Sequence, residues 1–172
     1  MGDHYLSIAH NGNLINIDEI RSELQADGAL FQTSTDTEII IHLIAREQGK
    51  NLAEKVEKAL HRIEGAYSLL LLSPNELIAV RDPHGIRPLC MGKLNDTIVF
   101  ASETCALDLL GEEYFRDVSK GEMIVTNNDG FDSKTIMLPR QSKHCIFEYI
   151  YFSRPDSKIF GTSVDKMRRA FG

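Results

Sequence analysis

Tryptophan is absent from this chain of 172 residues, and cysteine and long apolar runs are scarce. The three cysteines, Cys90, Cys105 and Cys145, are odd in number and far apart. We therefore expect reduced thiols and neither a disulfide framework nor a CxxC metal pair. The apolar run Leu69–Leu72 is far shorter than the roughly 20 residues of a membrane-spanning helix. Because the N-terminus also lacks a cationic segment followed by a long apolar one, we expect a cytoplasmic protein.

No basic run occurs either, and the charge is spread along the chain. The sequence has 25 acidic and 19 basic side chains, which give a formal net charge of −6. This balance argues against a nucleic-acid surface and against a polybasic membrane patch. Hydrophobic residues make up 42% of the chain and charged residues 26%, which is typical of a folded globular protein of about one domain.

Helical periodicity dominates the first third of the chain, and short apolar runs separated by turn residues follow it. We expect helices over 17–27, 35–48, 51–63 and 103–110, with capping boxes at Asn16 and Thr35, an N-cap at Ser102, and the start of another helix after Gly161. Strands are expected over 5–10, 66–72, 76–80, 89–92, 97–102, 115–118, 122–126 and 146–152, with a turn at 129–130. Helices followed by strands indicate an α+β fold, with helices packed on antiparallel sheet.

Two short motifs carry the chemistry, Ala9–Leu14 (AHNGNL) and Ser34–Glu38 (STDTE). The Asn11-Gly12 pair predicts a tight turn at the end of a strand. Its carboxamide N–H and backbone N–H suit the oxyanion of a tetrahedral intermediate, although the pair can equally be only a hairpin turn. The Asp36 carboxylate suits the ammonium group of an amino acid, or it can be a first-turn acid that gains from the helix dipole.

Two further features are interpreted as structural. The segment 81–88 (RDPHGIRP) forms a turn that Arg81 or Arg87 can lock through Asp82, with His84 solvated. We interpret His10 as a packed histidine and not as a base.

Several ordered segments resemble one enzyme family over nearly the whole chain. They are LSIAHNGNLIN, FQTSTDTE, GAYSLLLL, IAVRDPHGIRPLCMGKL, FASETCALDLLG, FRDVSKGEMIV and CIFEYIYFSRPDS. Together they resemble the glutamine-binding half of glutamine phosphoribosylpyrophosphate amidotransferase, an amidophosphoribosyltransferase. The motifs RDPHGIRPL and ASETCAL are shared with other amidotransferases that use an N-terminal cysteine, whereas AHNGNL with FEYIYFSRPDS is specific to this family.

The resemblance implies a fold and a domain division. It implies two stacked, mainly antiparallel sheets between helical layers, the αββα arrangement of N-terminal-nucleophile hydrolases. Residues 1–150 would be a partial class II glutamine amidotransferase domain, and 151–172 a linker and the start of a phosphoribosyltransferase domain. In the family an earlier segment supplies the cysteine nucleophile and an arginine for the glutamine carboxylate. Because this chain begins at Met1, we expect an incomplete N-terminus and no activity in isolation.

The resemblance also implies chemistry. Asn11 and Gly12 would form the oxyanion hole and Asp36 would bind the glutamine ammonium. The ammonia would pass to phosphoribosyl pyrophosphate, with magnesium in the absent half, to form 5-phosphoribosylamine for purine (IMP) biosynthesis. The full-length enzyme would be a homo-oligomer. Some members use a cysteine at the position of Cys145 as one ligand of a 4Fe–4S cluster. Because four ligands are needed, we expect no cofactor within this chain and a buried free thiol at Cys145.

Two other functions remain open. An asparagine-synthetase-type amidotransferase domain would share the RDPHGIRPL and ASETCAL motifs. A non-catalytic module that retains a glutamine pocket or an interaction surface would share the fold without the reaction.

Overall fold

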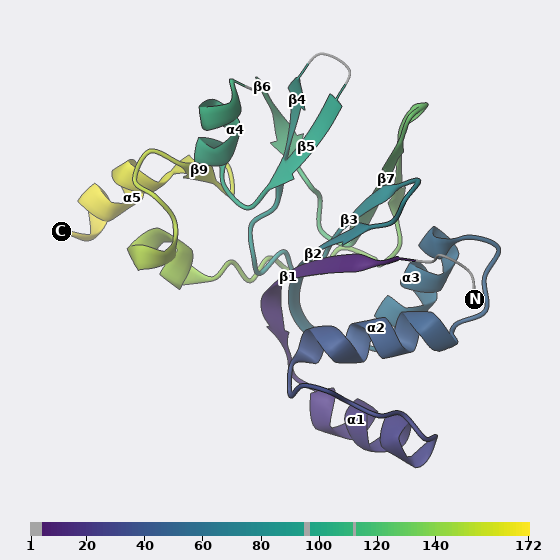
Figure 1. Cartoon of the computed structure of the whole chain (residues 1–172). Coiled ribbons are helices and arrows are strands. Elements are labelled where there is room, and N and C mark those ends of the chain that lie inside the picture. Colours follow the sequence, from purple (N-terminus) through teal and green to yellow (C-terminus); the bar gives the residue numbers. More distant parts are fainter. Residues whose placement is uncertain (1–4, 95–96, 112) are drawn as a thin grey trace.

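The computed structural model describes residues 5–94, 97–111 and 113–172 (Figure 1). The helices are α1 (Ile17–Ala26), α2 (Asp36–Arg46), α3 (Leu52–Leu60), α4 (Thr104–Leu110) and α5 (Val164–Phe171), with a π-helical segment η1 (Glu148–Phe152). The strands are β1 (Ser7–Leu14), β2 (Gly65–Leu72), β3 (Leu77–Arg81), β4 (Cys90–Leu94), β5 (Thr97–Ala101), β6 (Glu113–Asp117), β7 (Glu122–Asn127), β8 (Gly130–Thr135), β9 (Lys158–Ile159) and β10 (Thr162–Ser163). No helix among these residues is both long enough and apolar enough to cross a membrane.

The strands form two main antiparallel sheets. The larger sheet has the order β1-β2-β3-β7-β8 and the smaller one β5-β4-β6, and a two-stranded ribbon joins β9 to β10. Strand β1 pairs with β2 without interruption from Ser7 opposite Leu72 to Leu14 opposite Gly65. Among the described residues β1 therefore has a neighbouring strand on one side only, and its other edge is unpaired.

Side-chain alternation assigns each face of the larger sheet to a different core. Leu69 and Leu71 of β2 point toward α1, α2 and α3, whereas Leu70 between them points toward the smaller sheet. The core on the helical side contains Leu14, Ile20, Leu24, Ile39, Ile40, Leu43, Ile44, Val56, Leu60, Tyr67, Leu69, Leu71, Ile78, Val80 and Met123, among others. The core between the sheets contains Ala79, Leu89, Met91, Val118 and Ile124, with Leu70, Ile98 and Phe100 packed against it.

Helix α4 covers the outer face of the smaller sheet. A Cβ atom at Gly92 of β4 would lie 2.7 Å from the Leu107 side chain, so this helix packs closely on the strand. Figure 1 shows the resulting layers, with α1–α3 on one side, the two sheets in the middle and α4 beyond them. The expected α+β fold of two stacked sheets between helical layers is confirmed.

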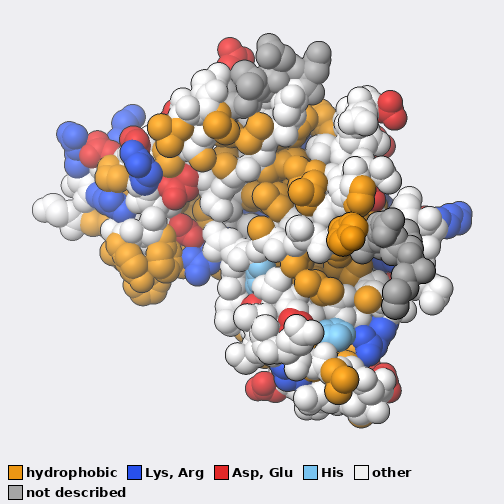
Figure 2. Space-filling view, viewed as in Figure 1, with side chains coloured by type: hydrophobic (Ala, Val, Ile, Leu, Met, Phe, Trp, Pro, Cys, Tyr) orange, Lys and Arg blue, Asp and Glu red, His pale blue; other side chains and the backbone are white. Residues whose placement is uncertain are grey.

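The C-terminal segment packs as a small unit beside the smaller sheet. Tyr149, Ile159 and Val164 form a separate buried cluster. Around η1 the side chains of Ile146, Phe147, Ile150, Tyr151 and Phe152 are exposed, and Figure 2 shows hydrophobic side chains gathered on this projecting part of the molecule.

Three local predictions are wrong. Residues 11 and 12 lie inside β1 and do not form a turn. Residues 146–152 are helical and do not form a strand, because Glu148 is buried in an ion pair with Arg87 instead of alternating outward. At Asn16 the side chain bonds the 62–64 segment instead of capping α1.

Two other helix starts differ in detail. The side chain of Thr35 makes no capping bond at α2, and the N-cap of α4 is Glu103 and not Ser102. At Asn51, the expected start of the third helix, the side chain caps α3 by accepting from the Glu54 N–H.

Candidate functional site

The unpaired edge of β1 presents the Gly12 N–H. In antiparallel sheet, the backbone groups of successive residues point alternately toward and away from the partner strand. The N–H of Ile15 donates to Glu64 O across the β1–β2 pair, so the N–H groups of odd-numbered β1 residues face β2. The Gly12 N–H therefore points off the free edge, where it is available to an acceptor.

Gly12 is also required by packing. A Cβ atom at this position would lie 2.0 Å from the Ala66 carbonyl oxygen of β2 and 2.8 Å from His10 Nε2. Any other residue would have to displace a backbone carbonyl of the neighbouring strand.

The Asn11 side chain leaves β1 on the face between the two sheets. Its Nδ2 donates to Ser102 Oγ over 3.4 Å, a long hydrogen bond. Both residues line a cavity of about 160 Å³, whose other walls come from Ala9, His10, Ser68, Leu70, Leu89 and Ala101. A carboxamide nitrogen carries two N–H donors, so one stays free for a ligand. Ser102 is a site residue that the sequence pattern misses, because it predicts only a helix cap there.

Asp36 reaches the same edge of β1 from the first turn of α2. Its Oδ2 accepts the Leu14 N–H at 3.2 Å, and its Oδ1 lies 3.4 Å from His10 Nδ1. The Asp36 side chain is 19% exposed and that of His10 3%. His10 Nδ1 also lies 3.3 Å from Thr37 Oγ1, so the interpretation of His10 as packed is confirmed. What the sequence does not indicate is that His10 packs on the Asp36 carboxylate and orients it.

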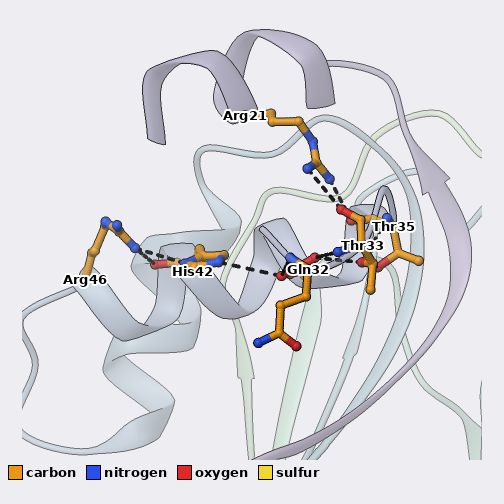
Figure 3. A network of polar contacts seen from close by, with 7 residues as sticks. Arg21, Gln32, Thr33, Thr35, His42 and Arg46 are labelled. Carbon is orange, nitrogen blue, oxygen red and sulfur yellow. Dashed lines mark hydrogen bonds and ion pairs between the residues drawn. The ribbon is translucent and has the colours of Figure 1, made fainter. Parts of the chain in front are cut away.

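The loop before α2 is held by a polar network (Figure 3). The Glu38 carboxylate accepts the N–H groups of Gln32 and Thr33 at 2.7 Å each, and the Thr33 hydroxyl as well. These bonds, chiefly the one from Gln32, hold the pKa of Glu38 below its ordinary value. Arg21 donates to the Thr33 and Thr35 carbonyls from α1. The network fixes the start of α2 and thereby the position of Asp36.

The 81–88 segment is structural, but the predicted Arg–Asp lock is wrong in detail. Arg81 is 4% exposed and donates to the carbonyls of Gly85, Arg87 and Val118. Asp82 accepts the N–H groups of His84 and Ile86. Each charged side chain thus bonds backbone groups, Arg81 also reaching Val118 outside the loop, and the two do not pair with each other.

None of the three cysteines lines the cavity beside Asn11. Cys90 and Cys105 are buried, Cys145 is half-buried, and all three are free thiols. The Cys145 sulfur lies 3.7 Å from Arg87 Nη1. Within the described residues no three His, Cys, Asp or Glu side chains gather as a metal site would require. Burial raises the pKa of Cys90 to about 12.

The family follows from a comparison with known protein families. The model of the glutamine amidotransferase domain matches residues 1–109, which include Asn11, Gly12, Asp36 and Ser102. The chain belongs to the glutamine amidotransferase domain family. Its similarity to known proteins extends beyond the matched range and covers 97% of the chain.

Curated relatives of this amidotransferase domain are amidophosphoribosyltransferases. Amidophosphoribosyltransferase 2 of Arabidopsis thaliana, a chloroplastic protein, is 46% identical over 97% of this chain and 30% of its own length. The Bacillus subtilis amidophosphoribosyltransferase is 42% identical over 97% of this chain and 35% of its own length. The chain thus spans about a third of the length of these relatives.

Comparison with solved structures supports the same family assignment. The glutamine phosphoribosylpyrophosphate amidotransferase of B. subtilis, complexed with ADP and GMP, superposes on 98% of this chain with a TM-score of 0.95 and 41% identity, and the match covers 37% of that protein. A class II domain protein from Silicibacter pomeroyi shares the fold alone, at a TM-score of 0.57 and 16% identity. The resemblance inferred from the sequence motifs is confirmed, and so is the fold.

Proposed function

We propose that this chain is the glutamine-binding half of an amidophosphoribosyltransferase. In the whole enzyme it would release ammonia from glutamine for transfer to phosphoribosyl pyrophosphate, which gives 5-phosphoribosylamine for purine biosynthesis. The observation that carries the proposal is the unpaired edge of β1, where the Gly12 N–H points outward and the Asp36 carboxylate bonds the Leu14 N–H. The similarity to amidophosphoribosyltransferases over 97% of the chain supports it.

The spacing of the two groups fits an amino acid of glutamine's length. Asp36 bonds the Leu14 N–H, two residues along β1 from Gly12, a separation of about 7 Å on an extended strand. A ligand that spans this distance can place its ammonium against Asp36 and the oxygen of its side-chain amide near Gly12. Asn11 and Gly12 would then stabilise the oxyanion that forms when a nucleophile attacks the amide carbon.

The isolated chain lacks a suitable nucleophile at this position. None of its three thiols lines the cavity beside Asn11, and the high pKa of Cys90 disfavours its thiolate. We therefore propose that the chain alone neither hydrolyses glutamine nor binds phosphoribosyl pyrophosphate. Magnesium and any 4Fe–4S cluster that includes Cys145 would need ligands beyond those of the described residues.

The domain division belongs to the same proposal. Residues 1–150 would form most of the amidotransferase domain, and 151–172 would lead into the phosphoribosyltransferase part. The separate cluster of Tyr149, Ile159 and Val164 supports a new structural unit near this boundary. We further propose a cytoplasmic location and a homo-oligomeric full-length enzyme.

The match to the family model ends at residue 109, whereas the similarity to amidophosphoribosyltransferases extends into residues 110–172. This additional similarity favours the proposed function over an asparagine-synthetase-type domain. An experiment distinguishes a non-catalytic glutamine-binding module from these two catalytic functions. Calorimetric titration of the purified chain with glutamine, alongside a glutamate-release assay, should show neither tight binding nor product above a no-protein control. Tight binding without turnover would support the module, and glutamate release would contradict the proposed inactivity.

The residue roles are tested in a chimaera in which this chain replaces the matching segment of the B. subtilis relative. Product formation is measured with glutamine and, separately, with free ammonia, which bypasses the glutamine site. Asn11→Ala should lower the glutamine-dependent kcat by about 10²–10³ through loss of an oxyanion donor. The ammonia-dependent rate should not change. Asn13→Ala, at an exposed carboxamide on the same strand, is the matched control.

Asp36→Asn in the same chimaera tests the ammonium site. It should raise KM for glutamine by about 10- to 100-fold, since a charged hydrogen bond is lost. Asp18→Asn removes an exposed first-turn carboxylate of α1 and serves as its control. A glutamine-dependent rate that survives both Asn11→Ala and Asp36→Asn would refute the proposed roles.

A further inference from the structure

Glu103 connects the candidate site to the C-terminal segment. This residue precedes α4, and its Oε2 accepts two hydrogen bonds from the 154–157 turn. One comes from the Arg154 N–H at 2.7 Å and the other from Ser157 Oγ at 2.8 Å. Ser157 is 1% exposed, so its hydroxyl depends on this carboxylate in a place that excludes water.

The residues on either side of Glu103 extend the connection. Ser102, which precedes Glu103, accepts a hydrogen bond at its Oγ from Asn11 Nδ2 of β1. The Thr104 hydroxyl accepts the Lys158 N–H at 2.9 Å, which binds the same C-terminal segment to the first turn of α4. Three consecutive residues therefore join β1 to residues 154–158.

We propose that Glu103 is a positioning residue for the Asn11 carboxamide, acting through Ser102. This inference rests on the proposed function of Asn11 as an oxyanion donor. It adds a residue outside the glutamine pocket, and it makes the geometry of that donor depend on whether the 154–157 turn is docked.

The physical reason is the weakness of the last contact. At 3.4 Å the Asn11–Ser102 bond is near the limit for a hydrogen bond, so a small shift of Ser102 breaks it. Without the Glu103 carboxylate, the Arg154 N–H and the buried Ser157 hydroxyl lose their acceptor, and the turn must move to satisfy them. The backbone at 102–104 then keeps only the Thr104–Lys158 contact on that side, so Ser102 is held less firmly and the carboxamide can rotate.

The conservative variant gives the sharpest contrast. Glu103→Gln keeps a carbonyl oxygen that can accept both bonds, whereas Glu103→Ala removes the acceptor. Asp108→Ala changes an exposed carboxylate on the same helix and is the matched control. Ser157→Ala removes only one of the two contacts to Glu103, so it replaces Glu103→Ala in the test if that variant does not fold.

The first measurement uses the 172-residue chain and the NMR signals of the Asn11 side-chain amide. Ser102→Ala identifies the effect of losing the contact, and Glu103→Ala or Ser157→Ala should shift the signals in the same direction. Glu103→Gln and Asp108→Ala should leave them in place. Asn11 signals that do not respond to Glu103→Ala or Ser157→Ala would overturn the proposal.

The second measurement uses the chimaera. Glu103→Ala should lower the glutamine-dependent kcat by about 10- to 100-fold, as expected when a catalytic group is misplaced, with KM unchanged because Asp36 is not touched. Glu103→Gln should restore the rate. If Asn11→Ala has no effect, the proposed function fails. If Asn11→Ala abolishes activity and Glu103→Ala does not, only the role of Glu103 fails.

Discussion

A buried carboxylate connects the two sheets, and its titration can be followed. Glu122 begins β7 of the larger sheet and is 5% exposed. Its two oxygens accept from Arg116 of β6, in the smaller sheet, at 2.7 and 2.8 Å. The Ser119 N–H donates to it at 2.6 Å. The Ser133 hydroxyl of β8 is a further donor to this carboxylate. The ion pair therefore holds the sheets together beside the core between them.

These contacts set the pKa of Glu122. Burial alone would raise it, but the hydrogen bonds from Arg116, Ser133 and Ser119 outweigh burial and lower the pKa from 4.5 to about 2. Such a depressed value stabilises the fold above the unfolded pKa of 4.5, and the stabilisation is lost as the pH falls toward 2. The shift corresponds to about 3 kcal/mol, which we reduce to about 2–3 because Arg116 is partly exposed.

Urea unfolding of the wild-type chain and of Glu122→Gln at pH 7 and pH 3 measures this contribution. At pH 7 the variant should be less stable by about 2–3 kcal/mol. At pH 3 roughly half of that difference should have disappeared, because wild-type Glu122 is then losing its advantage. Glu19→Gln, at an exposed glutamate of α1, controls for loss of charge. Equal stability at pH 7, or a difference that does not depend on pH, would refute the reasoning.

Three further predictions concern the backbone, the thiols and a buried cation. Gly121→Ala should destabilise the chain in urea by about 1–3 kcal/mol more than Gly28→Ala. Both glycines have positive φ, but only at Gly121 would the added Cβ meet a carbonyl oxygen, at 2.1 Å. Equal losses of stability in the two variants would contradict this. At pH 8 a thiol reagent should modify Cys145 in the native chain and Cys90 only after unfolding, because Cys90 is buried and its pKa is about 12. Rapid labelling of Cys90 in the native chain, detected by peptide mass, would be inconsistent with its burial. Arg81→Lys should cost about 2–4 kcal/mol in the same urea assay, since an ammonium cannot reproduce the fork that bonds three carbonyls. A loss below the uncertainty of the measurement would show that the loop does not depend on that fork.

The helices and most strands could be predicted because their signals are local. Apolar spacing places Leu43 and Ile44 on the buried face of α2, and the Asn51 cap lies next to the helix that it begins. Residues 146–152 show where this fails. Six of the seven are apolar, so neither period is distinct, and the partner of the buried Glu148 lies 61 residues earlier in the chain. Long-range contacts of this kind override β propensity.

The chemistry of the candidate site stays a prediction, and the sequence indicates its residues but not their contacts. Motif resemblance names Asn11, Gly12 and Asp36, but it does not indicate how each is held. His10 contacts Asp36 across 26 residues of sequence, and Asn11 contacts Ser102 across 91. Neither pairing has a local periodicity, so only the folded chain shows them. The turn expected at residues 11 and 12 also fails for this reason, because pairing with β2 extends the strand through Asn-Gly.

The close approach of Gly12 to Ala66 bears on how such domains change over time. Because packing alone requires glycine at this position, a descendant that had lost the reaction would still retain it. Asn11 is under no such constraint, since its side chain lines a cavity and makes one long contact to Ser102. Among sequences that share this fold, a glycine at the position of Gly12 therefore does not indicate that the protein is active. If Asn11 donates to the oxyanion as proposed, its replacement would record that activity was lost.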